Sequence, residues 1–501
     1  MGAEGSRFAA LLSFRGVLAF WIVYGVAHAL LRLTMTRTLT IDDARANELT
    51  QTLAFGYQLR QPPLYEWLLW CVQQVLGAGI ESHLLVRYSL IALLGLATFG
   101  AVKAAVKDDR WAAAASLSLA FAYPVAWTFH EWATQTIVLS VACMLTMHAG
   151  IRWFEAPGLR AAIFLGVAFA LGALSKFSYP LFLGGLLLAA LSMRDTRAGL
   201  ADLRLLVAIA IAGLALAPYA LWVLQMRGDV VADLSSHLVA NEWSHARRAA
   251  YGLWRLAVSI PTFLLPWILV VALIAPAAFV RARADALAPS LGERLSLRTM
   301  LFAAALAAGG IVALGATNIA ARYMHPILIV APVFVFARVA RLAAGEVRLR
   351  QFAATALIFA VFVFGFRFVA ATDNPVTRVL ERRLLIPYAE LAEGLEAQGI
   401  RDGTAISPSV REAGNLRAFI PELRVIARDS LRVERPPRRA SDDRSCVLVW
   451  ADGQAGIARG MAPFDPADVK QIDVVASSGI VAARPTTWFV VSLDPQSQAC
   501  R

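Results

Sequence analysis

The chain alternates long apolar runs with short polar segments, and this pattern predicts a polytopic α-helical membrane protein. A helix needs about 17 to 25 apolar residues to cross the hydrocarbon core of a bilayer, and we find about eleven such runs. The runs extend over Gly16 to Leu33, Leu84 to Val106, Trp111 to Ala126, Thr134 to Ile151, Ala161 to Ser175, Pro180 to Met193, Leu205 to Leu224, Ser259 to Val280, Met300 to Ala316, Tyr323 to Val339 and Phe352 to Ala371. The two runs on either side of Lys176 are interpreted as two short helices or as one re-entrant hairpin.

The pattern changes after residue 372 to short runs rich in Val and Ile, which are typical of β-strands. An amphipathic helix is predicted over Tyr388 to Gln398, and a turn or helix joins the first two strands. The predicted strands cover Thr404 to Ser407, Leu423 to Ala427, Cys446 to Trp450, Ile472 to Ala476 and Trp488 to Leu493. We therefore predict a transmembrane domain over residues 1–371 and a small α/β domain over residues 372–501.

Composition and charge agree with a membrane protein. The chain is 58% hydrophobic with a mean hydropathy of +0.61, which is more apolar surface than a water-soluble core can bury. Lys and Arg fall in the short loops on one side of the spans, beginning with Arg7 and Arg15, and this distribution predicts a cytoplasmic N-terminus. An odd number of spans then places the α/β domain outside. Topology and lipid contact account for the net charge of +12, so we expect no nucleic-acid partner.

Two cysteines of the predicted outer domain, Cys446 and Cys500, lie in an environment that permits disulfides. A disulfide between them and two separate thiols are both compatible with the sequence.

Candidate chemistry gathers in the first outer loop, about Thr34 to His83. Asp42 and Asp43 are adjacent, and helical spacing brings Asp42 and Arg45 to one face. A carboxylate beside a guanidinium suits a transfer reaction, because the carboxylate accepts the proton of an attacking hydroxyl while Arg binds a departing phosphate. The alternative is that Asp42 or Asp43 is only the N-cap of a loop helix.

Several motifs of the chain resemble those of one enzyme family. They are Asp42-Asp43-Ala-Arg45, Gln61-Pro62-Pro63-Leu64, Lys176 after Gly-x-Leu-Ser, and Arg322-Tyr323-Met-His325-Pro326. Over roughly residues 15–340 the chain is similar to polyprenyl-phosphate-sugar-dependent glycosyltransferases of the GT-C type. This superfamily includes protein O-mannosyltransferases, lipid A aminoarabinose transferases and lipopolysaccharide galacturonosyltransferases.

The resemblance implies a fold, a reaction and a location. The fold is a polytopic helical domain with a C-terminal periplasmic α/β domain in the bacterial inner membrane. The donor is a sugar on a polyprenyl phosphate, and the reaction inverts the anomeric carbon. The acceptor is lipid A, lipopolysaccharide core or another envelope glycan, with protein O-glycosylation as the alternative. Membrane lipids are the remaining partners.

The resemblance also implies site roles. Asp42 is the expected general base and Asp43 its helper, while Arg45, Lys176 and Arg322 are expected to bind the donor phosphate. A second acidic position is expected at Glu131, which is otherwise a solvated loop carboxylate.

Four further residues are expected to contact substrate, namely Gln61, Tyr57, Tyr65 and His325. The aromatic ones are equally typical of interfacial anchors. Gln61 departs from the Lys or His that relatives carry before the first Pro, which argues against an aminoarabinose donor and leaves Arg60 or Lys176 to bind the phosphate.

No cofactor is required, because Arg and Lys can neutralise the leaving phosphate. A divalent ion held by the pair Asp42 and Asp43 together with His130 and Glu131 stays an open alternative.

Two other functions share the many spans: a lipid or solute transporter, and a scaffold for envelope assembly that uses the tail for docking. A transporter predicts charged or broken helices at mid-membrane, whereas the charges here gather in the outer loops. We therefore favour the glycosyltransferase.

Overall fold

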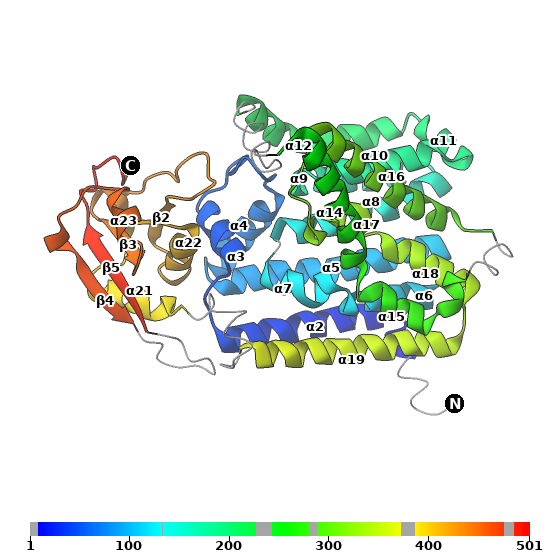
Figure 1. Ribbon diagram of the computed structural model, residues 1–501, viewed down its shortest axis with the longest axis horizontal. Helices are drawn as coiled ribbons and strands as arrows, with labels where there is room; N and C mark the ends of the chain where they lie inside the picture. The colour runs from blue at the N-terminus through cyan, green and yellow to red at the C-terminus, as the bar shows by residue number, and fades with distance from the viewer. Residues whose placement is uncertain (1–8, 133, 227–242, 281–287, 372–385, 475–484) are drawn as a thin grey trace. The chain divides into compact units, whose positions relative to one another are not determined.

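The computed structural model describes residues 9–132, 134–226, 243–280, 288–371, 386–474 and 485–501. The chain folds as two compact units, each built from segments that are distant in sequence (Figure 1). The first, here called the helical unit, consists of Met1–Gly25, Leu59–Leu64 and Ser89–Val363. The second, here called the mixed unit, consists of Val26–Gln58, Tyr65–Tyr88 and Phe364–Arg501. These units reflect packing, so the predicted division of the sequence at residue 371 stays a prediction.

The helical unit consists of apolar helices joined by short loops. Its elements, including three helices that continue into the mixed unit, are α2 (Phe14–Met35), α5 (Ile80–Val106), α6 (Asp109–Ser118), η1 (Leu119–Phe121), η2 (Pro124–Thr128), α7 (Phe129–Glu131), α8 (Thr134–Glu155), α9 (Leu159–Ser175), α10 (Tyr179–Leu191), α11 (Arg194–Leu200), α12 (Leu205–Gln225), α14 (His245–Leu264), α15 (Trp267–Ile274), η3 (Pro276–Phe279), α16 (Leu291–Leu314), η5 (Ala321–Tyr323), α17 (His325–Leu328), α18 (Ala331–Leu342) and α19 (Glu346–Ala371). Helices α8, α9, α10 and α16 lie side by side (Figure 1).

The structure confirms the polytopic helical fold. Among the described residues, seven helices are long and apolar enough to cross a membrane, or up to nine if each of two bent helix pairs is one span. Two shorter apolar helices, α9 and α10, flank Lys176 as separate helices. The total of about eleven spans stays a prediction.

Two expected spans are bent. The span expected over Trp111 to Ala126 bends by 57° between Phe121 and Pro124, because proline has no amide hydrogen to continue the helix. The span expected over Ser259 to Val280 starts too late: helix α14 begins at His245 and the pair α14–α15 bends by 53°. Its N-terminal half carries Arg247, Arg248 and Arg255 on an amphipathic helix, and these charges hide it from a search for apolar runs.

The mixed unit contains a five-stranded sheet and helices from both ends of its sequence. Its other elements are α3 (Ile41–Leu49), α4 (Leu64–Leu76), α21 (Tyr388–Ala397), β1 (Gly403–Ser407), α22 (Val410–Phe419), β2 (Leu423–Ala427), η6 (Ala440–Asp443), β3 (Cys446–Ala451), α23 (Ala455–Arg459), η7 (Pro466–Asp468), β4 (Lys470–Val474) and β5 (Thr486–Ser492). The strand order is β2-β1-β3-β5-β4; β1 is parallel to β2 and β3, and β5 is antiparallel to β3 and β4. All five strands and the helix α21 occur where the sequence predicts them. The last two residues of the strand expected over Ile472 to Ala476 lie outside the described residues.

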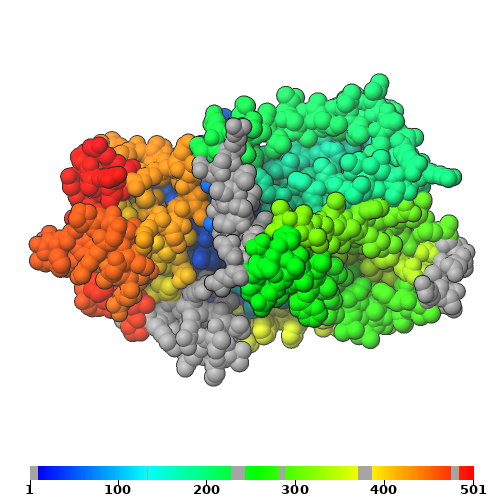
Figure 2. Space-filling model, turned by 45° about the horizontal axis from the view of Figure 1, so that its top comes forward, coloured from blue at the N-terminus to red at the C-terminus, as the bar shows by residue number. Residues whose placement is uncertain are grey.

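Alternating side chains of the strands build two cores, one on each face of the sheet. Val447 and Val449 of β3 face α21 and α22, while Cys446, Leu448 and Trp450 face the opposite core. Cys446 and Cys500 form a disulfide, with their Cα atoms 6.2 Å apart, which closes the second core. The C-terminal segments, orange to red in Figure 2, form one continuous body.

Candidate active site

Helix α3 carries the acidic pair, and its N-cap is Thr40. The Thr40 hydroxyl accepts a hydrogen bond from the Asp43 amide at 3.4 Å, so neither Asp42 nor Asp43 is the cap. Both carboxylates lie in the first turn, where the positive end of the helix dipole favours negative charge. The sequence left the cap open, and the structure settles it in favour of Thr40.

Asp43 is buried and ion-paired. Its Oδ1 accepts a hydrogen bond from Arg87 at 2.6 Å and lies 3.7 Å from the His83 ring. Burial alone would raise the pKa of Asp43, but Arg87, His83 and Thr40 hold it well below its ordinary value. The contacts make Asp43 a residue that fixes helix α3. Its expected role as a helper that orients the acceptor stays a prediction.

Asp42 lies on the more open face of the same helix. Its Oδ1 is 3.9 Å from Nη1 of Arg45, and the two side chains are 30% and 32% exposed. Arg45 Nε is buried and has no hydrogen-bond partner among the described residues. A half-exposed carboxylate next to a guanidinium with an unused N–H is the arrangement that the spacing predicts.

The C-terminal end of α3 is held by two arginines that lie more than 360 residues further along the chain. Arg417 donates to the carbonyl oxygens of Asn47 and Thr50, the latter at 3.2 Å. Arg432 donates to the carbonyl oxygens of Glu48 at 3.3 Å and Leu49 at 2.7 Å. These are carbonyls that a helix end leaves without intrahelical partners.

Helix α3 also packs closely on α22. Asn47 donates to the Gly414 carbonyl at 2.8 Å, and Asn415 accepts from the Leu39 amide at 2.7 Å. A Cβ at Gly414 would lie 2.0 Å from the Ala44 carbonyl oxygen, so only glycine permits this approach. The α/β module is thus the platform on which the acidic helix rests.

Glu48 is the third acidic residue of α3, and it is fully buried. Its Oε2 accepts from the Ser430 hydroxyl at 2.9 Å. Burial raises the pKa of Glu48 to about 7, although Arg432, Ser430 and Arg417 act in the opposite direction. Asp429 adds to the increase. The sequence gave no signal for this environment, because Glu48 is one helical turn from Arg45 and looks like a surface residue.

Tyr57 and Tyr65 are buried in the mixed unit. The Tyr57 hydroxyl donates to the Thr52 carbonyl at 2.9 Å and accepts from the Ala54 amide at 3.2 Å. Burial raises the pKa of Tyr57 to about 12. The Tyr65 hydroxyl has no hydrogen-bond partner among the described residues. Their predicted contact with substrate stays a prediction, and for Tyr57 the structure shows a local role in shaping the loop.

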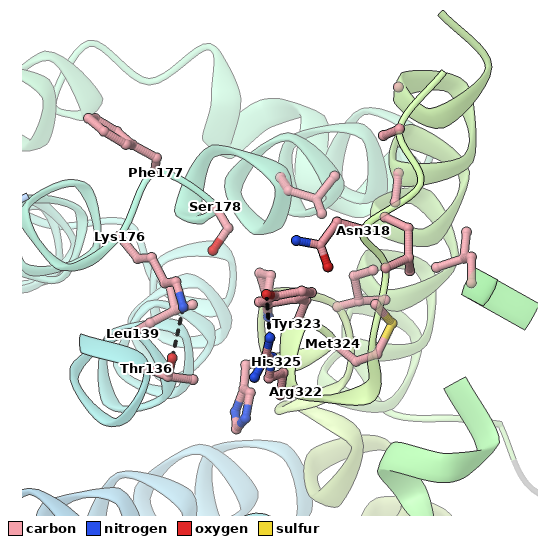
Figure 3. Close-up of a pocket in the computed structure, with 18 of the residues that line it drawn as sticks. Thr136, Leu139, Lys176, Phe177, Ser178, Asn318, Arg322, Tyr323, Met324 and His325 are labelled. Carbon is pink, nitrogen blue, oxygen red and sulfur yellow. Dashed lines mark hydrogen bonds between the residues drawn. The ribbon is translucent and has the colours of Figure 1, made fainter. Parts of the chain in front are cut away.

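A cavity of about 420 Å³ lies in the helical unit, and it contains four of the other expected residues. Lys176, Arg322, Gln61 and His325 all line it, together with Arg60. Its remaining walls are largely aliphatic, with Leu139, Leu181, Leu256, Ile311, Leu314 and Ile319. Figure 3 shows Lys176 and Ser178 on one side of this cavity, and Asn318 and Tyr323 on the other.

Lys176 is placed by the break between two apolar helices. Helix α9 ends at Ser175, and Lys176 has extended backbone before α10 begins at Tyr179. Its Nζ donates to the Thr136 hydroxyl at 2.8 Å (Figure 3). One turn along α8, the Ser140 hydroxyl is 2.9 Å from Nδ1 of His325, so one face of α8 positions both basic residues.

The other expected residues differ in exposure. Arg322 is exposed, donates to the Tyr323 hydroxyl at 3.0 Å and stacks on that ring. Gln61 Oε1 is buried without a hydrogen-bond partner among the described residues. Glu131 ends the short helix α7 and is half-buried; the preceding His130 is fixed by a 2.8 Å hydrogen bond to Tyr24.

Sequence reasoning missed several residues, above all Arg87, Arg417 and Arg432. Arg87 offered one signal, a cation within the first turns of an apolar run. The other two lie in a distant domain and offered none. Within the described ranges, no group of three or more His, Cys, Asp or Glu is placed to hold a metal ion. Asp42 and Asp43 lie in the mixed unit, and His130 and Glu131 lie in the helical unit.

Comparison with known proteins identifies the class. Residues 60–222 match the family described as dolichyl-phosphate-mannose-protein mannosyltransferase. The chain is 27% identical over 439 residues to the lipopolysaccharide core galacturonosyltransferase RgtA of Rhizobium johnstonii, covering 85% of each chain. It is 26% identical over 421 residues to RgtB of the same organism, covering 82% of this chain and 83% of RgtB.

A solved structure shares the fold. The structure of ArnT from Cupriavidus metallidurans bound to undecaprenyl phosphate matches with a TM-score of 0.59 at 14% identity, covering 98% of this chain and 100% of ArnT. The apo structure of the same enzyme matches with a TM-score of 0.58, covering 95% of this chain and 98% of ArnT. The architecture is therefore that of a multi-pass membrane protein of the GT-C type with a small α/β module. Together with the two sequence relatives and the family match, it makes this chain a GT-C glycosyltransferase.

The buried ion pair between Asp43 and Arg87 predicts strong coupling. Asp43→Asn should destabilise the protein by about 3–5 kcal/mol, because it leaves the Arg87 charge buried without a carboxylate. The double variant Asp43→Asn/Arg87→Met should be more stable than the sum of the two single losses implies. Thermal unfolding of the four proteins measures this cycle. Additive losses would show that the pair does not hold α3.

The raised pKa of Glu48 predicts a pH-dependent stability. Its pKa is about 7 in the folded chain and 4.5 ordinarily, so the unfolded chain ionises first. The stability that Glu48 contributes is therefore complete below about pH 4.5 and is lost as the pH rises to about 7, at about 1.4 kcal/mol per pKa unit of difference.

The unfolding midpoint of the wild type should thus fall relative to that of Glu48→Gln between pH 5 and pH 8. The exposed Glu434 provides the matched control, and Glu434→Gln should follow the wild-type pH dependence. Parallel curves for wild type and Glu48→Gln would contradict this account of Glu48.

Proposed function

We propose that this protein transfers a sugar from a polyprenyl-phosphate donor to a lipopolysaccharide core or lipid A acceptor. The reaction takes place on the periplasmic face of a bacterial inner membrane. Similarity to RgtA and RgtB over more than four fifths of the chain supports the acceptor and favours galacturonic acid as the sugar. The shared fold with an enzyme whose structure was solved bound to undecaprenyl phosphate supports the lipid-linked donor.

The observation that carries the proposal is the cavity of the helical unit. Its aliphatic walls suit a prenyl chain, which is entirely hydrocarbon. Lys176, Arg60 and Arg322 line the same cavity and provide the positive charge that a phosphate needs. A cavity that combines a greasy wall with three cations suits a lipid phosphate better than a neutral solute.

The proposed chemistry is a single inverting displacement. Asp42 accepts the proton of the acceptor hydroxyl, and the hydroxyl oxygen forms a bond to the anomeric carbon. The bond between that carbon and the donor phosphate oxygen breaks, and polyprenyl phosphate leaves with both electrons. Lys176 and Arg322 stabilise its charge, and Arg45 adds a further guanidinium. The inverting outcome follows because the attack and the departure occur on opposite faces of the sugar.

The remaining residues have supporting roles in this proposal. His325 is fixed by Ser140 and by the rings of Phe129 and Phe263, so it provides a rigid wall at the cavity. The unpartnered Oε1 of Gln61 accepts a hydrogen bond from a sugar hydroxyl. Glu131 is the second acidic residue, and Tyr65 offers its unpaired hydroxyl to the acceptor.

The proposed topology places the N-terminus in the cytoplasm and the α/β module in the periplasm. The arrangement of Lys and Arg in the short loops supports this orientation. The disulfide between Cys446 and Cys500 also supports it, because disulfides persist in the periplasm and are rare in the cytosol.

A transfer assay with the purified full-length protein tests the function. The donor is polyprenyl-phosphate-linked galacturonic acid and the acceptor is lipopolysaccharide core. Asp42→Asn should lower kcat by about 10²–10⁴-fold, because the acceptor hydroxyl loses its base. Binding of polyprenyl phosphate should persist, since Asp42 does not neutralise the donor.

Asp109→Asn is the matched control, because Asp109 is an exposed carboxylate paired with Lys103 at 2.8 Å and should transfer at the wild-type rate. Full activity of Asp42→Asn would exclude Asp42 as the base. Transfer to a protein substrate in place of the glycan would replace the proposed acceptor.

A further inference from the structure

A second cavity, of about 370 Å³, lies within the mixed unit. It is found where the parallel strands β1 and β2 end, at the register pairs of Ile406 with Ile426 and of Ser407 with Ala427. The segment that follows β2, from Arg428 to Pro436, forms much of its wall. Ligands of α/β folds bind outside the carboxyl ends of parallel strands, because loops there can vary without disturbing the sheet.

Charged side chains surround this cavity. Arg428, Arg432 and Arg435 line it, opposed by the carboxylates of Glu48 and Glu434. Arg428 is exposed, and within the described ranges its side chain makes no hydrogen bond or ion pair. Its backbone is fixed, because the Arg428 amide donates to the Ser407 carbonyl at 3.0 Å. The guanidinium is therefore a mobile cation on a rigid base.

Arg435 is held at one end and open at the other. Its Nη1 donates to the carbonyl oxygens of Gln498 at 2.9 Å and Ala499 at 3.3 Å, and the side chain is otherwise exposed. Arg432 is already occupied by backbone carbonyls of α3. Two guanidinium groups thus remain able to bind a carboxylate or a phosphate, each through paired N–H donors.

The rest of the lining suits a saccharide. Ile406, Ile426 and Met461 provide an apolar floor for the C–H face of a sugar ring. Ser430 and Glu48 add a hydroxyl and a buried carboxylate at 2.9 Å from each other, which can exchange hydrogen bonds with sugar hydroxyls. The volume is within the range of small-ligand pockets, about 300–1,000 Å³.

We propose that this cavity binds a saccharide that carries a carboxylate or a phosphate. Resting on the function proposed above, we infer that this saccharide is part of the glycan acceptor. Nothing in the proposed transfer reaction uses these arginines. The cavity is connected to the chemistry through α3, because Glu48 lies in its wall and Asp42 lies on the same helix. The α/β module would then hold the acceptor and the helix of the base at the same time.

A direct binding measurement on the full-length purified protein tests this proposal. The probes are trigalacturonic acid, which carries carboxylates, and maltotriose, a neutral trisaccharide. Calorimetry should detect trigalacturonic acid but not maltotriose. Arg428→Gln should weaken that binding at least tenfold, and Arg435→Gln should do the same. Arg401→Gln is the matched control, because Arg401 is an exposed arginine of the same module that does not line the cavity, and its binding should equal the wild type.

Unchanged binding in both Arg428→Gln and Arg435→Gln would overturn the proposal. Because Arg428 makes no side-chain contact that folding requires, its variant remains interpretable even if Arg435→Gln is unstable. Glycerol 3-phosphate, which mimics a phospholipid headgroup, should bind at least tenfold more weakly than trigalacturonic acid, and equal affinity would overturn the assignment to a saccharide.

The transfer assay separates this proposal from the function on which it rests. Arg428→Gln should raise the KM for the glycan acceptor and leave the KM for the donor unchanged. If the protein binds trigalacturonic acid through Arg428 but transfers no sugar, the cavity is supported and the proposed function fails. If transfer proceeds with an unchanged acceptor KM in Arg428→Gln, the function stands and the cavity is not the acceptor site.

Discussion

The mixed unit depends on the hydrogen bonds that Arg417 and Arg432 donate to the C-terminal carbonyls of α3. A helix of nine residues is too short to be stable alone, and its end leaves carbonyl groups that need donors. The two arginines supply these donors, Thr40 caps the opposite end, and the ion pair between Asp43 and Arg87 fixes the first turn. Three constraints on one short helix leave Asp42 and Arg45 on its open face, which is the preorganisation that a proton acceptor requires.

The helical unit obeys a different constraint, set by lipid. Its backbone hydrogen bonds must be satisfied within helices, so irregular backbone occurs where helices break, and these breaks carry the polar chemistry. Lys176 lies in the break between α9 and α10, and Arg322 lies in the short helix η5 before α17. A charge in an apolar setting is costly, which is why Lys176 is held by Thr136 and lines a cavity rather than facing acyl chains. The prediction that charges belong to function is consistent with this placement.

The sequence predicted the elements better than their partners. Apolar periodicity located the long helices, and alternating Val and Ile located all five strands, because burial acts on neighbouring residues. The start of α14 was missed, since Arg247, Arg248 and Arg255 break the apolar pattern without breaking the helix. For the site, local spacing predicted that Asp42 and Arg45 share a face, and it left the N-cap undecided. It could not predict that Asp43 is buried against Arg87 or that Glu48 contacts Ser430, because both depend on segments brought together only by folding.

The most direct test of the central claim, that this protein adds a sugar to an envelope glycan, is the mass spectrum of the envelope glycolipids. Cells that lack the protein would be compared with the same cells complemented by the wild-type chain. We expect one uronic acid residue to disappear from the lipopolysaccharide core or lipid A and to return on complementation, since the donor sugar has no other route to that acceptor. Identical spectra with and without the protein would contradict the account.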